Sequence, residues 1–260
     1  MSGASWRVAM ASSIGQSHVA AAQPCQDAHF HLEAKDAGGQ PVMVLAAADG
    51  AGSAALAELG ASLACETFAR LVEAYVGKGG RVAAIERSLV ERWINGLVYR
   101  IELDAKRSGA AVQDYSCTLL AAVIADNSAV FVQIGDGAMV IPAGTGWRHV
   151  FWPQHGEFAN TTNFVTSERA VPEMDFLRLD EAVQEIAVFT DGIENLVLQK
   201  ASRTAHAPFF DSMFPPVRKS QASGVDADLS QALDKYLSGP TITSRTDDDK
   251  TLILASRRRS

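Results

Sequence analysis

Aspartates lie beside apolar segments at four separated places in this sequence, and another lies between two glycines. The residues concerned are Asp27, Asp49, Asp191 and the run 247–249, with Asp136 as a fifth candidate. An Asp-Gly pair by itself indicates only a turn, because turns favour both residue types. Carboxylates that a fold brings together repel one another unless cations neutralise them. Several such places together therefore favour a metal site, and oxygen ligands without histidine or cysteine favour Mg²⁺ or Mn²⁺ over zinc.

Other residue types that could do chemistry form weaker patterns. His29 and His31 are the one close pair of histidines, but they alternate with Phe30 and Leu32, so we expect them on a solvent-facing strand edge rather than at a metal. The sequence contains neither a GxSxG nucleophile motif nor a GxxxxGK[ST] phosphate loop. Covalent serine catalysis and nucleoside triphosphate hydrolysis are therefore disfavoured.

Runs of apolar, β-branched residues bounded by Gly, Pro, Asn or Asp predict the strands that would carry the aspartates. Such runs cover residues 41–48, 117–124, 129–134, 186–189 and 251–254. Several are apolar throughout rather than alternating, so we expect both faces of those strands to be buried. Turn residues at 126–128, and again at 135–137, predict two tight hairpins.

Helical spacing of apolar residues predicts two long consecutive helices between the first two strands. They cover about 56–76, with glycines directly after, and about 82–107. A last amphipathic helix is predicted at 226–237, whereas three prolines are expected to interrupt residues 201–224, whose role is not predicted. Two long helices among antiparallel-looking strands predict an α+β layered domain rather than a repeating βαβ arrangement.

The composition of the 260-residue chain, 47% hydrophobic, suits one domain, and we expect residues 1–260 to form it. The formal net charge of −7 at pH 7 disfavours a nucleic-acid partner. No apolar run reaches the ~18 residues of a membrane span, so we expect a cytoplasmic protein with no membrane partner. Cys25, Cys65 and Cys117 form no CxxC pair and are expected to be reduced thiols.

The order of the aspartate motifs resembles that of the PP2C family of Ser/Thr phosphatases, and in particular its bacterial branch. The motifs that carry the resemblance lie at 15–18 and 24–27, 49–52, 135–137, 189–194 and 248–252. They span nearly the whole chain. The resemblance implies two antiparallel β-sheets packed face to face and flanked by pairs of helices, with the loop from about 155 to 167 as a flap beside the active site.

The resemblance also implies roles for individual residues. Asp49 would bridge two metal ions, the Gly50 carbonyl would bind one of them, and Asp191 and Asp248 would complete the other. Asp27 would hold a water at the metals, and Asp136 would assist Asp191 with a possible third ion. The implied catalytic residues are Asp27 and Asp49, and the implied metal-binding residues are Asp27, Asp49, Gly50, Asp136, Asp191 and Asp248.

The activity implied is hydrolysis of phosphoserine and phosphothreonine in proteins, by a water activated between two Mn²⁺ or Mg²⁺ ions. The partner implied is a phosphorylated protein, the target of a cognate kinase. The family commonly has a phosphate-binding arginine before the first aspartate, but residues 19–23 contain none. We therefore expect phosphate binding to depend more on the metals, or on a nearby residue such as His18.

Two alternatives stay open. The missing arginine, and Gln26 where many members have glutamate, motivate a phosphoprotein-binding module of the same fold with little or no turnover. The second alternative is a hydrolase of small phosphate esters, which the sequence does not separate from a protein phosphatase.

Overall fold

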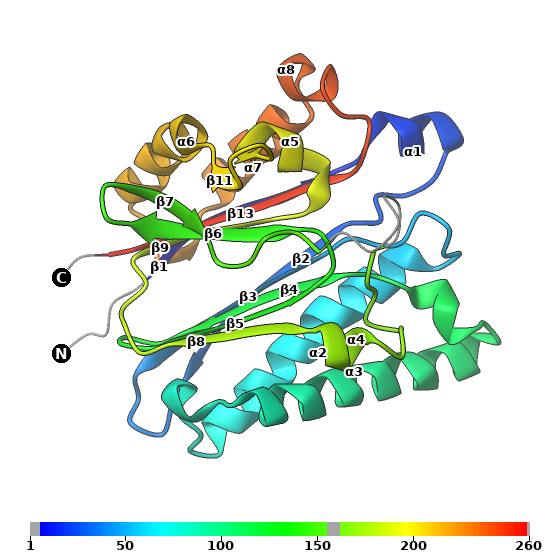
Figure 1. Ribbon diagram of the computed structural model, residues 1–260, viewed down its shortest axis with the longest axis horizontal. Coiled ribbons are helices and arrows are strands. Elements are labelled where there is room, and N and C mark those ends of the chain that lie inside the picture. Colours follow the sequence, from blue (N-terminus) through cyan, green and yellow to red (C-terminus); the bar gives the residue numbers. More distant parts are fainter. Residues whose placement is uncertain (1–5, 155–161, 259–260) are drawn as a thin grey trace.

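Two β-sheets pack face to face in the computed structural model, which describes residues 6–154 and 162–258 (Figure 1). The six-stranded sheet has the order β12 (Gly224–Val225), β1 (Trp6–Ser13), β13 (Lys250–Arg257), β9 (Glu185–Phe189), β6 (Ala138–Ala143) and β7 (Gly146–His149). The five-stranded sheet has the order β2 (Ala28–Lys35), β3 (Pro41–Ala48), β4 (Leu119–Ile124), β5 (Ala129–Ile134) and β8 (Asp175–Leu179). Neighbouring strands in both sheets are antiparallel except β1 and β12, which are parallel.

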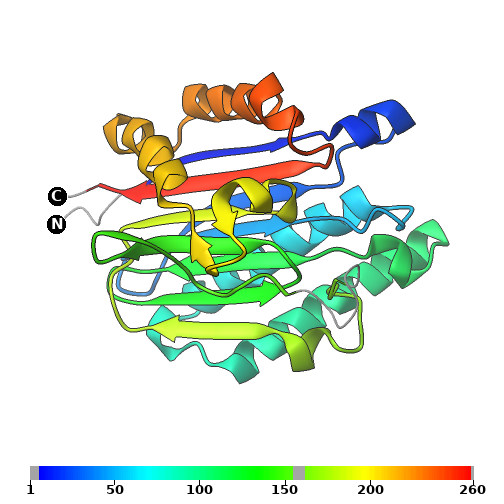
Figure 2. The same cartoon turned by 45° about the horizontal axis from the view of Figure 1, so that its top comes forward.

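Helices cover the outer face of each sheet. The longer helices are α2 (Ala57–Gly77), α3 (Arg87–Ser108), α6 (Ala207–Lys219) and α7 (Ala227–Leu237). The shorter elements are α1 (Gln16–Ala21), α4 (Ala170–Glu173), α5 (Glu194–Val197), α8 (Pro240–Thr243), the 3₁₀ helices η1 (Val82–Ala84), η2 (Val112–Tyr115) and η3 (Asp191–Ile193), and the two-stranded β10 (Leu198–Gln199) and β11 (Thr204–Ala205). In Figures 1 and 2, α2 and α3 lie on one side of the two sheets, and α6 and α7 lie on the other.

Three apolar layers hold this arrangement together. Leu45, Phe131 and Ile253 belong to the layer between the two sheets, Phe68 packs between the five-stranded sheet and α2, and Phe210 packs between the six-stranded sheet and α6. Because apolar side chains cover both faces of the central strands, every residue of β4 and β5 is buried, as the continuous apolar runs predict. The predicted fold class, two packed sheets flanked by pairs of helices, is confirmed.

The predicted helices are confirmed, with one shifted boundary. Residues 82–84 form η1 and Glu86 is extended, so α3 begins at Arg87 and ends where Gly109 adopts a φ of 72°. The Asp226 side chain caps α7 by accepting a hydrogen bond of 3.0 Å from the Leu229 amide. Residues 207–219 form α6, so the two prolines at 215 and 216 do not interrupt the chain as expected but lie inside a helix near its C-terminal end.

One predicted hairpin is confirmed and the other is wrong. Residues 125–128 close the turn between β4 and β5, where the Ala125 amide donates to the Ser128 carbonyl. Residues 135–137 instead connect β5 in one sheet to β6 in the other. Gly135 has a φ of 111°, which suits the expected sharp turn. The strand that follows pairs with β7 and β9, however, because its apolar face completes the six-stranded sheet.

The expectation that His29 and His31 face solvent is also wrong. Both lie on β2, an edge strand, but Leu32 packs toward α2, so the histidines lie on the opposite face, toward the other sheet. His29 Nδ1 lies 2.8 Å from the Ser12 Oγ of β1. Burial lowers the pKa of both histidines. The two rings therefore lie at the interface between the sheets.

The remaining sequence expectations concern the cysteines and membrane-spanning helices. Cys25, Cys65 and Cys117 are all free thiols, as predicted. Among the helices in residues 6–154 and 162–258, none combines the length and the apolar character that a membrane crossing requires.

Candidate active site

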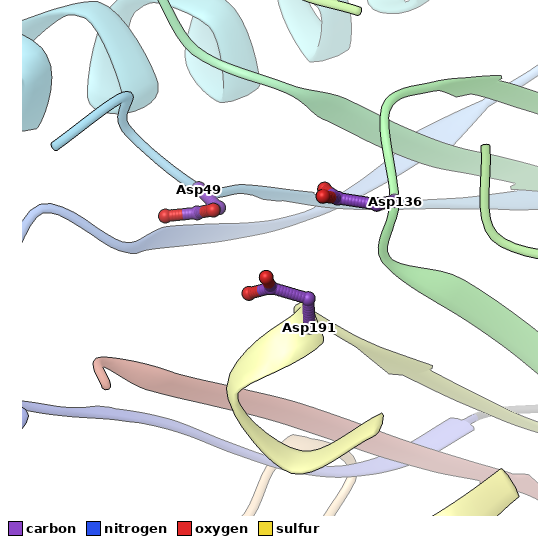
Figure 3. A group of neighbouring side chains, drawn as sticks. All are labelled: Asp49, Asp136 and Asp191. Atoms are coloured by element: carbon purple, nitrogen blue, oxygen red, sulfur yellow. The ribbon is translucent and has the colours of Figure 1, made fainter. Parts of the chain in front are cut away.

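Three carboxylates from three different elements meet at one end of the sheets. Asp49 directly follows β3, Asp136 lies in the connection from β5 to β6, and Asp191 begins η3 after β9. One carboxylate oxygen of each lies within 4.8 Å of those of the other two. Figure 3 shows the three side chains converging from separate ribbons on a common space. The five-stranded sheet and the six-stranded sheet thus both contribute to one acidic cluster.

Asp27 and Asp248 lie close enough to this cluster to act on its charge. Asp27 precedes β2, is buried, and accepts a hydrogen bond of 2.7 Å from the Thr190 hydroxyl. The charges of Asp27 and Asp248 both raise the pKa of Asp49 and that of Asp191. All five aspartates that were predicted to bind metal therefore lie in one electrostatic neighbourhood, although they are spread over most of the chain.

Burial makes this cluster costly to ionise. It is the largest cause that raises the pKa of Asp27 to about 7 and that of Asp191 to about 8, and it raises the pKa of Asp49 well above its usual value. In the part of the chain that the structure describes, Asp27 Oδ1 and Asp136 Oδ1 are buried and accept no hydrogen bond. Buried carboxylate oxygens without donors fit divalent cations with oxygen ligands.

Two threonines fix the backbone that carries these carboxylates. The Asp49 amide donates to Thr118 Oγ1 and the Thr118 amide donates to the Asp49 carbonyl, both at 2.8 Å, which joins the end of β3 to the residue before β4. The Thr190 hydroxyl, which donates to Asp27, accepts from the Thr251 amide at 2.9 Å. Sequence reasoning missed both threonines, because threonine is ordinary in strands.

Gly50 and Gly192 allow close backbone approaches at the site. A Cβ at Gly50 would lie 2.8 Å from both the Ala57 Cβ and the Gln26 carbonyl oxygen, so no side chain fits beside the start of α2. A Cβ at Gly192 would overlap the Asp249 carbonyl oxygen. The glycines that follow Asp49 and Asp191 are therefore required by packing. The expected binding of metal by the Gly50 carbonyl stays a prediction.

Asp249 organises the N-terminal motif and was missed. Its carboxylate is almost fully buried and accepts from the amides of Gly15 at 2.6 Å and Gln26 at 2.5 Å. His18 Nδ1 lies 2.8 Å from the same carboxylate, on the oxygen that Gln26 contacts. The expected contact between His18 and phosphate stays a prediction, and one ring nitrogen is already engaged. The run of three aspartates was the available signal, but it does not tell which of them faces inward.

Lys250 is a further residue that sequence reasoning missed. Its side chain is fully buried, and Nζ donates to the Asp248 carbonyl at 2.7 Å and to the Ile14 carbonyl at 3.3 Å. Lysine is rarely buried without partners, and two carbonyl oxygens satisfy most of its donors here. The ammonium group therefore links the loop before β13 to the segment before α1 through hydrogen bonds.

The expected flap at 155–167 can be described only in part, because residues 155–161 lie outside the described residues. At its C-terminal end, the Thr162 hydroxyl donates to Asp136 Oδ2 at 2.5 Å, and the Val165 amide donates to the Cys117 carbonyl at 2.8 Å. This end of the loop therefore contacts one of the clustered carboxylates.

A double sheet flanked by helices, with buried oxygen ligands gathered at one end, is the arrangement of a metal-dependent phosphatase. The family model described as "Protein phosphatase 2C" matches residues 14–238, and the chain belongs to this family. It is 35% identical over 251 residues to "Serine/threonine-protein phosphatase 3" of Escherichia coli (strain K12). The matched residues make up 96% of this chain and 98% of that protein.

Solved structures of bacterial phosphatases share the fold. The Mycobacterium tuberculosis serine/threonine phosphatase PstP/Ppp matches with a TM-score of 0.64 at 15% identity, covering 97% of this chain and 98% of that one. PppA, a regulatory component of T6SS in Pseudomonas aeruginosa, matches with a TM-score of 0.63 at 18% identity, covering 98% of both chains.

The raised pKa values predict how the stability of the metal-free protein depends on pH. The folded-state pKa values of Asp27 and Asp191, about 7 and about 8, lie above the unfolded value of 3.8. The folded state therefore binds more protons, so this contribution to stability is fully present below pH 3.8 and is lost as pH rises through 7 and 8. We expect the melting temperature of metal-free protein to fall between pH 5 and about 8.5, measured by differential scanning fluorimetry.

Asp191→Asn is the matched variant for this measurement, because it keeps the shape of the side chain and cannot ionise. Its metal-free melting temperature should fall less over the same pH range than that of the wild type. A wild-type melting temperature that rises with pH, or an identical slope in the variant, would contradict the assignment of these carboxylates.

Proposed function

We propose that this protein hydrolyses phosphoserine and phosphothreonine in proteins, with Mn²⁺ or Mg²⁺ held by its clustered aspartates. The observation that carries the proposal is the convergence of Asp49, Asp136 and Asp191, in a chain of the protein phosphatase 2C family. The E. coli relative is named a serine/threonine-protein phosphatase, which supports the same substrate class.

The proposed metal-binding residues are those with buried or converging oxygens, together with one backbone carbonyl. They are Asp27, Asp49, Gly50, Asp136, Asp191 and Asp248, for two or three ions. Burial and the charges of Asp27, Asp191 and Asp248 raise the pKa of Asp49, so this carboxylate lies among the other proposed ligands. Asp49 would be the ligand shared by the ions.

When bound, the ions supply Lewis-acid charge that lowers the pKa of water and neutralises charge on phosphate oxygens. The protein itself contributes by positioning the acidic residues. The threonines at 118 and 190 and the carboxylate of Asp249 hold the backbone in register, so that the acidic residues stay in place with little freedom to reorganise. Asp27 and Asp49 are the proposed catalytic residues.

His18 is the proposed contact for the phosphate of the substrate. Burial raises the pKa of Asp248, and the charge of His18 acts against that rise, so the ring lies near the acidic site. The carboxylate of Asp249 orients the ring through Nδ1, which leaves Nε2 as the nitrogen that can meet a phosphate oxygen.

We further propose a single domain over residues 1–260, a cytoplasmic location and, as substrate, the target of a cognate kinase. The three apolar layers join elements from both ends of the chain, which supports one folding unit. The remaining proposals rest on the family and on the chemistry of the site.

A comparison of two substrates tests the proposed function. With saturating Mn²⁺, we expect kcat/KM for a phosphothreonine peptide to exceed that for p-nitrophenyl phosphate by at least about tenfold, because contacts beyond the phosphate lower the barrier further. A preference for p-nitrophenyl phosphate would favour a hydrolase of small esters. Binding of the phosphopeptide without turnover of either substrate would favour the phosphoprotein-binding module.

A further inference from the structure

A polar cavity lies at the end of the six-stranded sheet that is far from the aspartates. Its volume is about 700 Å³, within the range of small-molecule sites, and its lining includes Arg7, Gln184, Glu185, Arg218, Ser256 and Arg257. Glu185 is the first residue of β9, and Asp191 lies two residues beyond the end of that strand. At ~3.3 Å per residue, the cavity therefore lies about 20 Å from the acidic cluster.

The cavity floor is a row of side chains across three neighbouring strands. Arg7 on β1 is paired with Ser256 on β13, and Ser256 is paired with Glu185 on β9. Arg218 from α6 covers the row at one side and donates to both Glu185 oxygens, at 2.7 Å and 2.6 Å. The Ser256 hydroxyl donates to Glu185 at 3.1 Å, so this carboxylate is fully engaged.

Arg7 is the unpaired member of this row. Arg218 has Glu185 as a carboxylate partner and Arg257 has Asp126. Within residues 6–154 and 162–258, Arg7 has no ion pair, and its Nε is buried without an acceptor. The side chain is half-buried, and its Nε–H loses water without gaining a partner, which costs free energy. In a chain with a net charge of −7, this is a local excess of positive charge.

We propose that this cavity is a binding site for a phosphate monoester group, separate from the catalytic site. Arg7 would supply a planar pair of donors, the geometry that suits phosphate oxygens, and the Gln184 amide and the free N–H groups of Arg218 lie on the same lining. The cavity is larger than a bare anion, so it has room for the rest of a phosphorylated small molecule or of a phosphorylated side chain.

Binding is tested on protein stripped of metal on a chelating resin, because a soluble chelator is itself a polyanion. Isothermal titration with O-phosphoserine and with a phosphoserine peptide should detect binding of at least one of them, and the unphosphorylated peptide should not bind. The arm that binds identifies the source of the phosphate. Because metal is absent and the catalytic cluster is acidic, neither turnover nor the proposed function affects the result.

Arg7→Gln should weaken binding at least tenfold. Arg92 is an exposed arginine on α3 that forms no ion pair within the described residues, so Arg92→Gln removes the same charge elsewhere and should bind like the wild type. Gln184→Glu places a negative charge at an exposed cavity position, which does not endanger folding, and should also weaken binding at least tenfold. Binding unchanged in both cavity variants, or no binding of either phosphorylated probe to the wild type, would overturn the proposal.

Discussion

Asp49→Asn is expected to lower kcat/KM for a phosphopeptide on the order of 10²–10³-fold, the loss found when one preorganised charge contact to a transition state is removed. Asparagine keeps the shape of the side chain but lacks the charge. Asp49 lies among the charges of Asp27, Asp191 and Asp248, so its loss affects every cation that the cluster holds. The measurement is steady-state kinetics across a range of Mn²⁺ concentrations up to saturation.

Asp136→Asn is the matched comparison. Asp136 converges with Asp49 and Asp191 but also accepts a hydrogen bond from Thr162, and in our proposal it serves a weaker ion. This variant should therefore keep partial activity at saturating metal. Equal losses in the two variants under that condition would show that Asp49 is not the bridging residue.

Folding controls separate this loss from damage to the protein. Because Asp49→Asn removes one of several repelling carboxylates, its metal-free form should melt at or above the metal-free wild type. It should also gain little stability from added Mn²⁺. A metal-free variant that melts well below the wild type would mean that Asp49 serves the fold rather than the cations.

Removal of metal is expected to reduce turnover by the wild type to the uncatalysed background, and readdition of Mn²⁺ or Mg²⁺ is expected to restore it. The acidic residues carry no nucleophile of the serine or cysteine kind, and their carboxylates need cations to be charged near neutral pH. The measurement is phosphate release before and after passage over a chelating resin, followed by titration with each ion.

Thermal stability provides a second readout of the same event. Cations that bind only the folded state should stabilise it by about 2.7 kcal/mol at a concentration one hundred times the dissociation constant. Wild-type turnover that persists after exhaustive metal removal would refute the proposed site. Restored stability without restored turnover would instead point to a binding module.

Much of the fold follows from local patterns that the sequence displays openly. The apolar runs at 117–124 and 129–134 correspond to strands buried on both faces, because a residue's hydrophobicity reports whether it is buried. The two long helices and the cap of α7 were also predictable, because helical spacing and capping involve residues only three or four positions apart. The family resemblance adds which aspartates to examine, but their roles stay predictions.

Tertiary structure alone decided which partner each segment meets. Residues 135–137 have the composition of a hairpin turn, yet β6 joins the other sheet, because strand pairing depends on which apolar surface is left uncovered. The surroundings of His29 likewise depend on β1 of the other sheet, because the Ser12 hydroxyl of that strand lies against its ring.

The same limit applies to the charged residues of the site. The sequence determined that aspartates lie at several strand ends, and that no histidine or cysteine pattern competes with them for metal. Composition did not separate Asp248 from Asp249, and only the family resemblance selected Asp248. In the structure Asp248 lies near the cluster, whereas Asp249 binds the Gly15 amide, 234 residues away in the chain. Nor did composition reveal that Lys250 is buried. Contacts across such separations arise only when the whole chain packs, so local composition carries no record of them.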